Sequence, residues 1–441
     1  MNNAALNNDT IAACSTAAGR SAIAILRLSG PEALTIAQKM FAKPLIPRTA
    51  LVGDIYGEDG ETLDNGVALC FPAPHSYTGE NCVEFHCHGS PIVASAVLRT
   101  MFSLGARQAL AGEFTRRAFL SGKLDLIQSE AVIDLIDAET EQAAVNAAAQ
   151  LNGAISREVN AVYDDLTLLL AHFHAFVDYP DEDIGDVTDY PQLASSIEIL
   201  TKLADTYNRG RIIRDGIRAV LIGAPNVGKS SLLNALAGSD RAIVTDIPGT
   251  TRDTIEVTLV LNGLRVTLID TAGFASSTSD LIERLGIERS KAEIERCDLV
   301  LAVYDASSPS GSVISTGDKK TLNVLNKCDL AQDSAADGIR VSAKTGEGLQ
   351  TLCEAISGLF DISQAADRSF ASALSNERQY AAISKASAAL KSAADALESG
   401  IAPDAALSDV EYALTALGEV NGRTVRSDVT DTIFARFCVG K

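Results

Sequence analysis

The sequence predicts a multidomain protein of mixed class, with α/β and all-α parts. Strand-like apolar runs alternate with helical runs between residues 217 and about 360, which is the pattern of a parallel sheet. Stretches rich in Ala, Leu and Glu lie on both sides of this segment, and the first 123 residues mix short strands with Gly and Pro turns. We therefore expect an N-terminal α/β domain, and a helical domain that is split by an inserted second α/β domain.

The expected boundaries follow these changes of composition. They are residues 1–123 for the N-terminal domain, 124–212 and 369–441 for the two parts of the helical domain, and 213–368 for the inserted domain. Apolar runs predict strands at Ser21–Leu28, Gly66–Phe71, Asn81–His88, Ile217–Ile222, Val266–Ile269, Leu299–Tyr304 and Leu322–Leu325. Helical spacing predicts helices at Ile92–Leu104, Asn376–Glu398 and Asp404–Leu417.

The composition is that of an acidic, cytoplasmic protein. The chain has 441 residues, a formal net charge of −20 and eight scattered cysteines, so we expect mostly reduced thiols. It has no long uncharged apolar run, and its N-terminus lacks the basic start and apolar core of a secretory signal, so we expect no membrane association. The negative charge disfavours general binding to nucleic acid, and an RNA partner therefore needs a local basic patch. The candidate patches are Arg116, Arg117 and Lys123, and the run Arg209, Arg211, Arg214 and Arg218.

A phosphate-binding motif follows the predicted strand at Ile217–Ile222. GAPNVGKS, Gly223–Ser230, fits the pattern G-x-x-x-x-G-K-[ST] and opens an Ala- and Leu-rich helical stretch, which is the context that this motif requires. Its glycines let backbone amides approach phosphate at a helix N-terminus. We expect Lys229 to neutralise the β and γ phosphates and the Ser230 hydroxyl to bind Mg²⁺.

Three further motifs follow in the order of a guanine-nucleotide site. DTAG, Asp270–Gly273, ends a strand and places a carboxylate near the metal ion. NKCD, Asn326–Asp329, ends a later strand, and its last carboxylate can accept both the ring NH and the exocyclic NH of guanine, which adenine does not offer. In SAK, Ser342–Lys344, a backbone amide can reach the guanine oxygen. The joint occurrence of these motifs predicts a P-loop, Ras-like GTPase domain.

The segment TDIPGTTRD, residues 245–253, stands where the first switch of such a domain belongs. Gly249 supplies backbone freedom, and Thr251 supplies a second hydroxyl for Mg²⁺. With the four motifs, it completes the set of residues expected to contact GTP. These are Asn226, Val227, Gly228, Lys229, Ser230, Ser231, Thr245, Asp246, Ile247, Pro248, Gly249, Thr250, Thr251, Asp270, Thr271, Ala272, Gly273, Asn326, Lys327, Asp329, Ser342, Ala343 and Lys344.

The flanks of the GTPase domain carry motifs of their own. They are LRLSG at residues 26–30, SYTGE and VEFHCHG within 76–89, GEFTRRAFLSGKLDL at 112–126, and FCVGK at 437–441. With the GTPase motifs between them, the chain resembles over nearly its whole length the MnmE family, also called TrmE, of tRNA-modification GTPases. The resemblance implies a folate-binding N-terminal domain that dimerises, a split helical domain and an inserted GTPase domain.

The resemblance also implies a reaction and partners. With its FAD-containing partner MnmG, in a heterotetramer, the family adds an aminomethyl or carboxymethylaminomethyl group to carbon 5 of the wobble uridine of certain tRNAs. A formyl- or methylene-tetrahydrofolate occupies the N-terminal domain of the homodimer, and GTP hydrolysis controls the complex.

By position, the resemblance places a K⁺ ion beside the nucleotide. Asn226 matches a residue that binds K⁺, and Thr245, Ile247 and Thr250 complete the ion's shell. A cation there can offset the charge that develops between the β and γ phosphates. The resemblance thus implies a K⁺-activated GTPase.

Two residues are carried over to the chemistry. Glu283, which opens ERLGIER, matches the glutamate that orients the attacking water, although the preceding FASSTSD differs from the family's Leu-Arg-Glu-Ala, and Glu288 is the alternative. Cys438 matches a near-terminal cysteine that the family needs for modification. From the residues alone, Cys438 fits equally well a reactive thiol near a basic chain end and a buried apolar cysteine beside Phe434 and Phe437.

The positions that match the family's folate site are Arg27, Glu84, Lys123 and Lys441. Cationic side chains suit the carboxylated tail of a folate, and a carboxylate can bond the NH edge of a pterin. Without the resemblance, each of them is more typical of a surface or strand charge.

Strand residues Cys82, His86, Cys87 and His88 also suggest a metal site. Alternate residues of a strand face opposite sides, so at most two of them point together, whereas zinc needs three or four ligands. The pattern therefore disfavours a metal.

Two other functions compete with tRNA modification. An Era-like regulatory or ribosome-assembly GTPase would use the nucleotide only to gate binding, but such proteins carry an RNA-binding module such as KH, and no GxxG loop of that kind follows residue 360. A pure dimerisation scaffold would have a vestigial folate pocket, and the presence of Arg27, Glu84, Lys123 and FCVGK argues against it.

Overall fold

The computed structural model describes residues 9–178, 190–238, 255–270, 292–308, 317–331, 337–360, 372–399, 403–424 and 427–441. The chain forms two compact units. The first comprises Met1–Ile133, Gln150–Ile197 and Lys385–Lys441, and the second comprises Asp134–Ala149 and Glu198–Ser384.

The first unit contains a sheet with strand order β3-β4-β5-β2-β1-β6. Its elements are β1 (Ile11–Cys14), β2 (Ile23–Ser29), α1 (Ala33–Met40), β3 (Leu51–Tyr56), β4 (Thr62–Phe71), β5 (Cys82–His88), α2 (Pro91–Ser103), β6 (Arg107–Gln108) and α3 (Glu113–Leu120). One face of the sheet packs Leu26 and Phe85 against α1 and α2, and Phe114 of α3 joins Ile11 in a separate cluster. In the antiparallel pair β2 and β5, Arg27 lies opposite Glu84.

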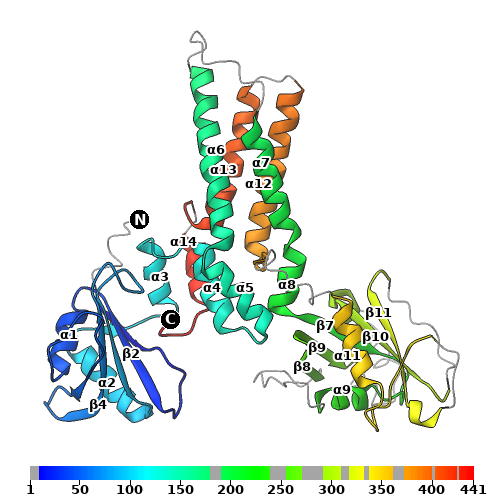
Figure 1. The fold of residues 1–441 in the computed structure, drawn as a ribbon, viewed down its shortest axis with the longest axis horizontal. Helices are drawn as coiled ribbons and strands as arrows, with labels where there is room; N and C mark the ends of the chain where they lie inside the picture. Colours follow the sequence, from blue (N-terminus) through cyan, green and yellow to red (C-terminus); the bar gives the residue numbers. More distant parts are fainter. Residues whose placement is uncertain are drawn as a thin grey trace. The chain divides into compact units, whose positions relative to one another are not determined.

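Long helices follow the first sheet along the chain (Figure 1). They are α4 (Leu126–Ile136), α5 (Glu141–Leu151), α6 (Ala154–Asp178), α7 (Pro191–Asp205), α8 (Tyr207–Asp215), α12 (Glu377–Glu398), α13 (Pro403–Asn421) and α14 (Ser427–Phe434). Helices α6 and α13 run side by side, and Asn421 donates to Asn160 over 3.0 Å between them. Phe434, the last residue of α14, and Phe437, which follows the helix, pack with Leu126 of α4.

The second unit contains a sheet with strand order β12-β11-β10-β7-β9-β8, in which only β8 is antiparallel to its neighbour. Its strands are β7 (Ile217–Ile222), β8 (Ile255–Leu261), β9 (Leu264–Asp270), β10 (Leu299–Asp305), β11 (Lys320–Asn326) and β12 (Ile339–Arg340), with helices α9 (Lys229–Ala237) and α11 (Leu349–Gly358) and a 3-10 turn at Cys328–Leu330. Along β7, Ala219 and Leu221 pack in one cluster with α9 and α11, while Val220 and Ile222 pack in another. Strands buried on both faces are typical of a parallel sheet.

The predicted mixed α/β and all-α class is confirmed. The strand Ile217–Ile222 has the predicted bounds, and the helix predicted at Ile92–Leu104 begins and ends one residue earlier. Strand β1 was missed because its four residues are too few to show a period. Within the part of the chain that the structure describes, no helix has both the length and the apolar character that a bilayer crossing requires.

Candidate functional site

The phosphate-binding motif lies in the loop between β7 and α9. Gly228 has a left-handed backbone and precedes the first residue of α9, Lys229, which is only 7% exposed. The Nζ of Lys229 donates to the carbonyl oxygens of Gly223 and Ala224 over 2.9 and 3.0 Å. Burial lowers the pKa of Lys229, and the nearby Asp270 carboxylate opposes this shift. The ammonium group is thus held inside the loop whose backbone amides are suited to phosphate.

The end of β9 lies beside the start of α9. The Ser230 hydroxyl donates to Oδ2 of Asp270 over 2.5 Å, and Asp270 is 2% exposed. A hydroxyl and a carboxylate side by side are the hard oxygen ligands that Mg²⁺ prefers. The two side chains therefore fit the Mg²⁺ ion that accompanies a nucleoside triphosphate.

The NKCD and SAK motifs lie close together beside the phosphate-binding loop. Asn326 is 2% exposed, and its Nδ2 donates to the carbonyl oxygen of Val227 over 2.8 Å. Its Oδ1 accepts a hydrogen bond of 3.1 Å from the backbone nitrogen of Ala343. Asp329, which is exposed, accepts a hydrogen bond of 2.7 Å from the Ser342 hydroxyl. This arrangement leaves the Asp329 carboxylate accessible to a base.

Lys327 connects the same loop to the end of β10. Its Nζ donates to the carbonyl oxygen of Asn226 over 2.8 Å and pairs with Oδ2 of Asp305 over 2.6 Å. The hydrogen bond from Lys327 lowers the pKa of Asp305. Asp305 was not among the predicted site residues, because no motif marks the end of this strand.

Several predicted contacts lie outside the described residues. They are the first-switch residues Thr245, Asp246, Ile247, Pro248, Gly249, Thr250 and Thr251, the DTAG residues Thr271, Ala272 and Gly273, and the glutamates Glu283 and Glu288. Ser231 and Lys344 are described, and both are exposed.

A second group of predicted residues lies on the first sheet. Arg27 Nε pairs with Oε1 of Glu84 over 2.8 Å, and both side chains are largely but not fully buried. The guanidinium carbon of Arg27 lies 5.4 Å from the centre of the Tyr77 ring and 5.6 Å from that of Phe114. Burial raises the pKa of Tyr77. A charge pair beside two aromatic rings can bind a flat polar ligand.

Sequence reasoning did not select Tyr77 and Phe114, although SYTGE and GEFTRR contain them. Lys123 is exposed. It lies near the loop that carries Tyr77, since a Cβ added to Gly79 would lie 3.5 Å from Lys123 Cγ. The carbonyl oxygen of Lys441 accepts a hydrogen bond of 3.1 Å from the backbone nitrogen of Phe114. Lys441 is thereby fixed to α3, the helix that carries Phe114, whose ring lies against Arg27.

Cys438 is exposed, whereas the preceding Phe437 is buried. The carbonyl oxygen of Cys438 accepts a hydrogen bond of 3.4 Å from the backbone nitrogen of Gly112, and Ser15 Oγ donates to the Gly440 carbonyl over 3.0 Å. The interpretation of Cys438 as a buried apolar residue is therefore wrong. Its thiol is accessible on a tail whose backbone is held against the N-terminal domain.

The two predicted basic patches are largely neutralised by acidic neighbours. Arg117 is 2% exposed and pairs with Asp9, Glu80 and Glu113, so it is not a surface cation. In the second run, the partners are Asp298 for Arg211, Asp134 for Arg214, and Glu256 and Glu293 for Arg218. Acidic partners thus offset the charge of these arginines in both candidate patches, and charge spacing in a sequence does not show which acids fold against it.

The histidines of β5 have carboxylate partners. His86 lies 3.4 Å from Glu84, and His88 lies 2.7 Å from Asp64. Cys82 and Cys87 are buried. Among the described residues, no three His, Cys, Asp or Glu side chains are placed together as metal ligands.

Comparison with known proteins identifies the family. The family model described as GTP-binding protein TrmE N-terminus matches residues 10–123, and that of the MnmE helical domain matches 126–438. The tRNA modification GTPase MnmE of Thermotoga petrophila is 42% identical over 98% of this chain and 100% of its own length. The protein of the same name from Xanthomonas campestris pv. campestris is 43% identical over 98% and 99%.

Among solved structures that resemble this chain is the G domain of the T. maritima FeoB iron transporter. It is 26% identical over 32% of this chain and 97% of its own length, with a TM-score of 0.24. That score is too low for the likeness to support an argument. The family rests instead on the two family models and the nearly full-length relatives. The chain belongs to the MnmE (TrmE) family of tRNA modification GTPases.

Proposed function

We propose that the protein is a K⁺-activated GTPase that acts with FAD-dependent MnmG. Together they add an aminomethyl or carboxymethylaminomethyl group to carbon 5 of the wobble uridine of certain tRNAs. The observation that carries the proposal is the assembly of the phosphate loop, NKCD and SAK around Asn326, in a chain whose relatives are named tRNA modification GTPases over nearly full length.

The described residues give the GTPase part of the proposal a physical basis. When GTP binds, Lys229 exchanges its carbonyl partners for the β and γ phosphates and stabilises their negative charge. Ser230, whose hydroxyl bonds Asp270, would hold Mg²⁺ together with Thr251, and Asp270 would lie beside the ion. Asp329 accepts hydrogen bonds from the guanine NH groups, and the backbone amide of Ala343 or Lys344 faces the guanine oxygen. A Mg²⁺ ion held at Ser230 would supply positive charge against the phosphates.

For K⁺, the proposed ligands are Asn226, Thr245, Ile247 and Thr250, of which the structure describes only Asn226. Its backbone has a φ of 66°, which turns the loop sharply, and its side chain is exposed. An oxygen ligand at the rim of the phosphate loop is suitably placed to share a cation with the nucleotide. Glu283 is the proposed residue that orients the attacking water.

The proposed folate site consists of Arg27, Glu84, Lys123 and Lys441 in the N-terminal domain. The Arg27 and Glu84 pair supplies both charges that a pterin edge can bond, and Tyr77 and Phe114 supply aromatic faces. Lys123 and Lys441 would bind the carboxylates of a formyl- or methylene-tetrahydrofolate tail. A bound folate supplies the one-carbon unit, and these residues orient it.

The remaining parts of the proposal concern organisation. We infer a cytoplasmic homodimer that joins MnmG in a heterotetramer and binds tRNA. We also infer a division into domains at residues 1–123, 124–212, 213–368 and 369–441. The matched ranges 10–123 and 126–438 support the first of these boundaries.

The proposal is tested by reconstitution. The purified chain is mixed with MnmG encoded by the same genome, tRNA, FAD, GTP, Mg²⁺, K⁺ and methylene-tetrahydrofolate, and the wobble nucleoside is analysed by mass spectrometry. The proposal predicts a modified uridine that requires the chain, GTP and folate, and that is lost in Arg27→Ala and Glu84→Ala. An intact chain that hydrolyses GTP but forms no modified uridine would instead be an Era-like, nucleotide-gated scaffold.

A further inference from the structure

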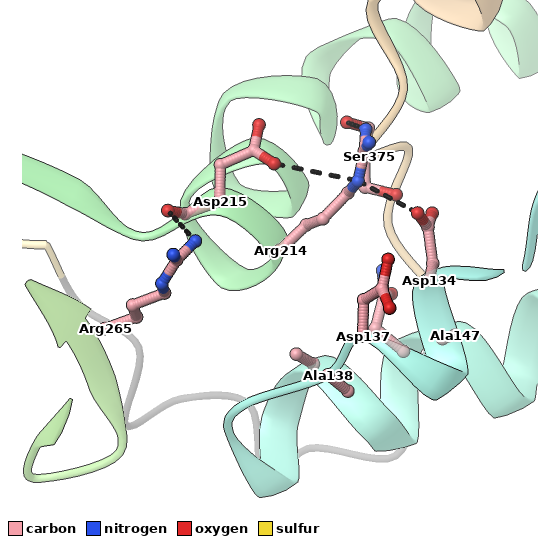
Figure 2. A pocket seen from close by; sticks show the side chains of 10 residues that line it. Asp134, Asp137, Ala138, Ala147, Arg214, Asp215, Arg265 and Ser375 are labelled. Atoms are coloured by element: carbon pink, nitrogen blue, oxygen red, sulfur yellow. Dashed lines mark hydrogen bonds and ion pairs between the residues drawn. The ribbon is translucent and has the colours of Figure 1, made fainter. Parts of the chain in front are cut away.

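A polar cavity of about 160 Å³ lies in the second unit, away from the nucleotide motifs along the chain. Figure 2 shows charged side chains from α4, α8 and β9 around it, together with the segment that precedes α12. The charged and polar residues that line it include Asp134, Asp137, Arg214, Asp215, Arg265 and Ser375. The chain passes this cavity on its way into the GTPase domain, just before β7, and again after leaving it.

Two arginines fasten the end of α4 and the turn that follows it at this cavity. Arg214 Nε pairs with Oδ1 of Asp134 over 3.0 Å, and Nη1 of the same side chain donates to the carbonyl oxygen of Ser375 over 3.1 Å. Arg265 Nε pairs with Oε2 of Glu139 over 2.8 Å, and its Nη1 donates to the carbonyl oxygen of Asp215 over 3.2 Å. We name these two arginines with Asp134 and Glu139 the arginine joint.

Arg265 lies on the hairpin that connects the two segments expected to sense the nucleotide. Strand β8 begins at Ile255, directly after the predicted first switch, and β9 ends at Asp270, the first residue of DTAG. The turn between them contacts α5, because a Cβ added to Gly263 would lie 2.9 Å from Gln142 Nε2. One end of the hairpin thus adjoins the nucleotide motifs and the other end contacts α5, with each strand spanning roughly 20 Å.

Asp134 lies on α4, and the other end of this helix packs beside the segment that contains Cys438. Helix α4 runs from Leu126 to Ile136, and Leu126 packs with Phe434 and Phe437, immediately before Cys438. Leu126 and Asp134 lie on this one helix, roughly two turns apart. The joint therefore acts on a helix that packs beside the Cys438 tail.

From these contacts we propose that the arginine joint carries nucleotide-dependent movement of the β8 and β9 hairpin to α4, and so makes tRNA modification depend on GTP hydrolysis. The inference rests on the proposed function for its tRNA part only. Arg214 and Arg265 are positioning residues, because among the described residues their partners are Asp134, Asp215, Glu139 and Ser375, none of which belongs to a nucleotide motif. A coupling of this kind requires a segment whose state both sites bias, and residues 134–149 are that segment.

The first test needs no tRNA. Hydrogen exchange of residues 134–149 is measured in the full chain with GDP and with a non-hydrolysable GTP analogue. The proposal predicts a difference between the two nucleotides in the wild type, and its loss in Arg265→Gln and Arg214→Gln, with nucleotide affinity changed by no more than about twofold. Exchange that is the same for both nucleotides in the wild type would overturn the joint, whatever the modification assay shows.

The second test uses the reconstituted reaction. Arg265→Gln is expected to keep the kcat of GTP hydrolysis within about twofold and to lower modified tRNA per GTP hydrolysed by about tenfold. The yield of modified tRNA per GTP hydrolysed is expected to recover in part in the double variant Arg265→Glu with Glu139→Arg, which exchanges the two charges. Failure of the wild type to modify tRNA would count against the proposed function, while the exchange experiment would still decide on the joint.

Arg211→Gln is the matched control. Arg211 lies on the same helix, α8, and its ion pair of 2.7 Å with Asp298 is buried to a similar extent, but it does not involve the turn between α4 and α5. The proposal predicts that this variant keeps both the exchange difference and the modification yield. An equal loss in Arg211→Gln would show a general weakening of the domain and would overturn the specific role of the joint.

Discussion

The side-chain nitrogen of Asn326 donates a hydrogen bond of 2.8 Å to the carbonyl oxygen of Val227. Through its other atom, Oδ1, Asn326 also accepts from the backbone of Ala343. One buried side chain therefore joins the phosphate loop to both loops proposed to contact guanine. The contact also requires a glycine next to Val227, because a Cβ at Gly228 would lie 2.3 Å from Asn326 Nδ2.

Gly228→Ala is expected to weaken GTP binding by at least about tenfold, because it adds this clash to the cost of roughly 1–2 kcal/mol for a left-handed alanine. Titration of GTP and GDP measures the loss. Gly60→Ala is the control, since Gly60 has a similar φ of 79° and nothing within 4 Å of the added Cβ. Equal nucleotide affinity in the two variants would contradict the role of the Asn326 contact.

Asn226→Ala and replacement of K⁺ by Na⁺ are each expected to slow GTP hydrolysis by about a hundredfold, because both remove positive charge from the developing transition state. Steady-state phosphate release at saturating GTP gives kcat. Combining the variant with Na⁺ should add little further loss if both act on one ion. Equal rates of the wild type in the two salts would exclude activation by K⁺.

The sequence predicts best where backbone and ligand chemistry allow few residue types. Gly228, Lys229 and Asn326 were selected from motifs, and the structure places them together. Long-range electrostatics was not predictable in this way. The motif RRAF, residues 116–119, is typical of a surface segment, yet its Arg117 is buried. Asp9 and Glu80, which are distant in sequence, pair with it. The pairing of Arg265 with Glu139 likewise depends on the tertiary fold alone.

The buried network around Arg117 is expected to make the first unit sensitive to acid. Burial opposes ionisation of Glu113 and Asp9, but hydrogen bonds outweigh it and lower both pKa values. Glu113 accepts from Arg107 and from the backbone nitrogen of Leu110, and Asp9 accepts from Arg107 and Arg117. A lowered pKa in the folded state stabilises the protein above the ordinary values of 4.5 and 3.8, and this stability is lost as the pH falls through the folded-state pKa values.

Melting temperature measured from pH 7 down to pH 3, in steps of about half a unit, tests this. The wild type should lose stability below about pH 4.5. Glu113→Gln should be less stable than the wild type at pH 7 and should show a smaller further loss on acidification. Parallel curves for the two proteins would mean that Glu113 does not contribute to the acid transition.

Cys438→Ser is expected to keep GTP hydrolysis and lose tRNA modification, because the thiol is exposed while the backbone of the tail makes the contacts with Gly112 and Ser15. Both activities are measured on the same preparation. Cys353→Ser, which changes a partly buried cysteine on α11, is the control and should retain both. Loss of hydrolysis in Cys438→Ser would indicate a structural role for the thiol.

Asp329→Asn tests whether GTP bound at this site drives tRNA modification. An asparagine can accept from the ring NH of xanthine and donate to its exocyclic oxygen, whereas the carboxylate of Asp329 suits the two NH groups of guanine. Modified wobble uridine is measured in the reconstituted reaction with GTP or with xanthosine triphosphate. The variant is expected to form product with xanthosine triphosphate and little with GTP, the reverse of the wild type. Undiminished GTP-driven product in the variant would show that modification does not depend on the nucleotide at this site.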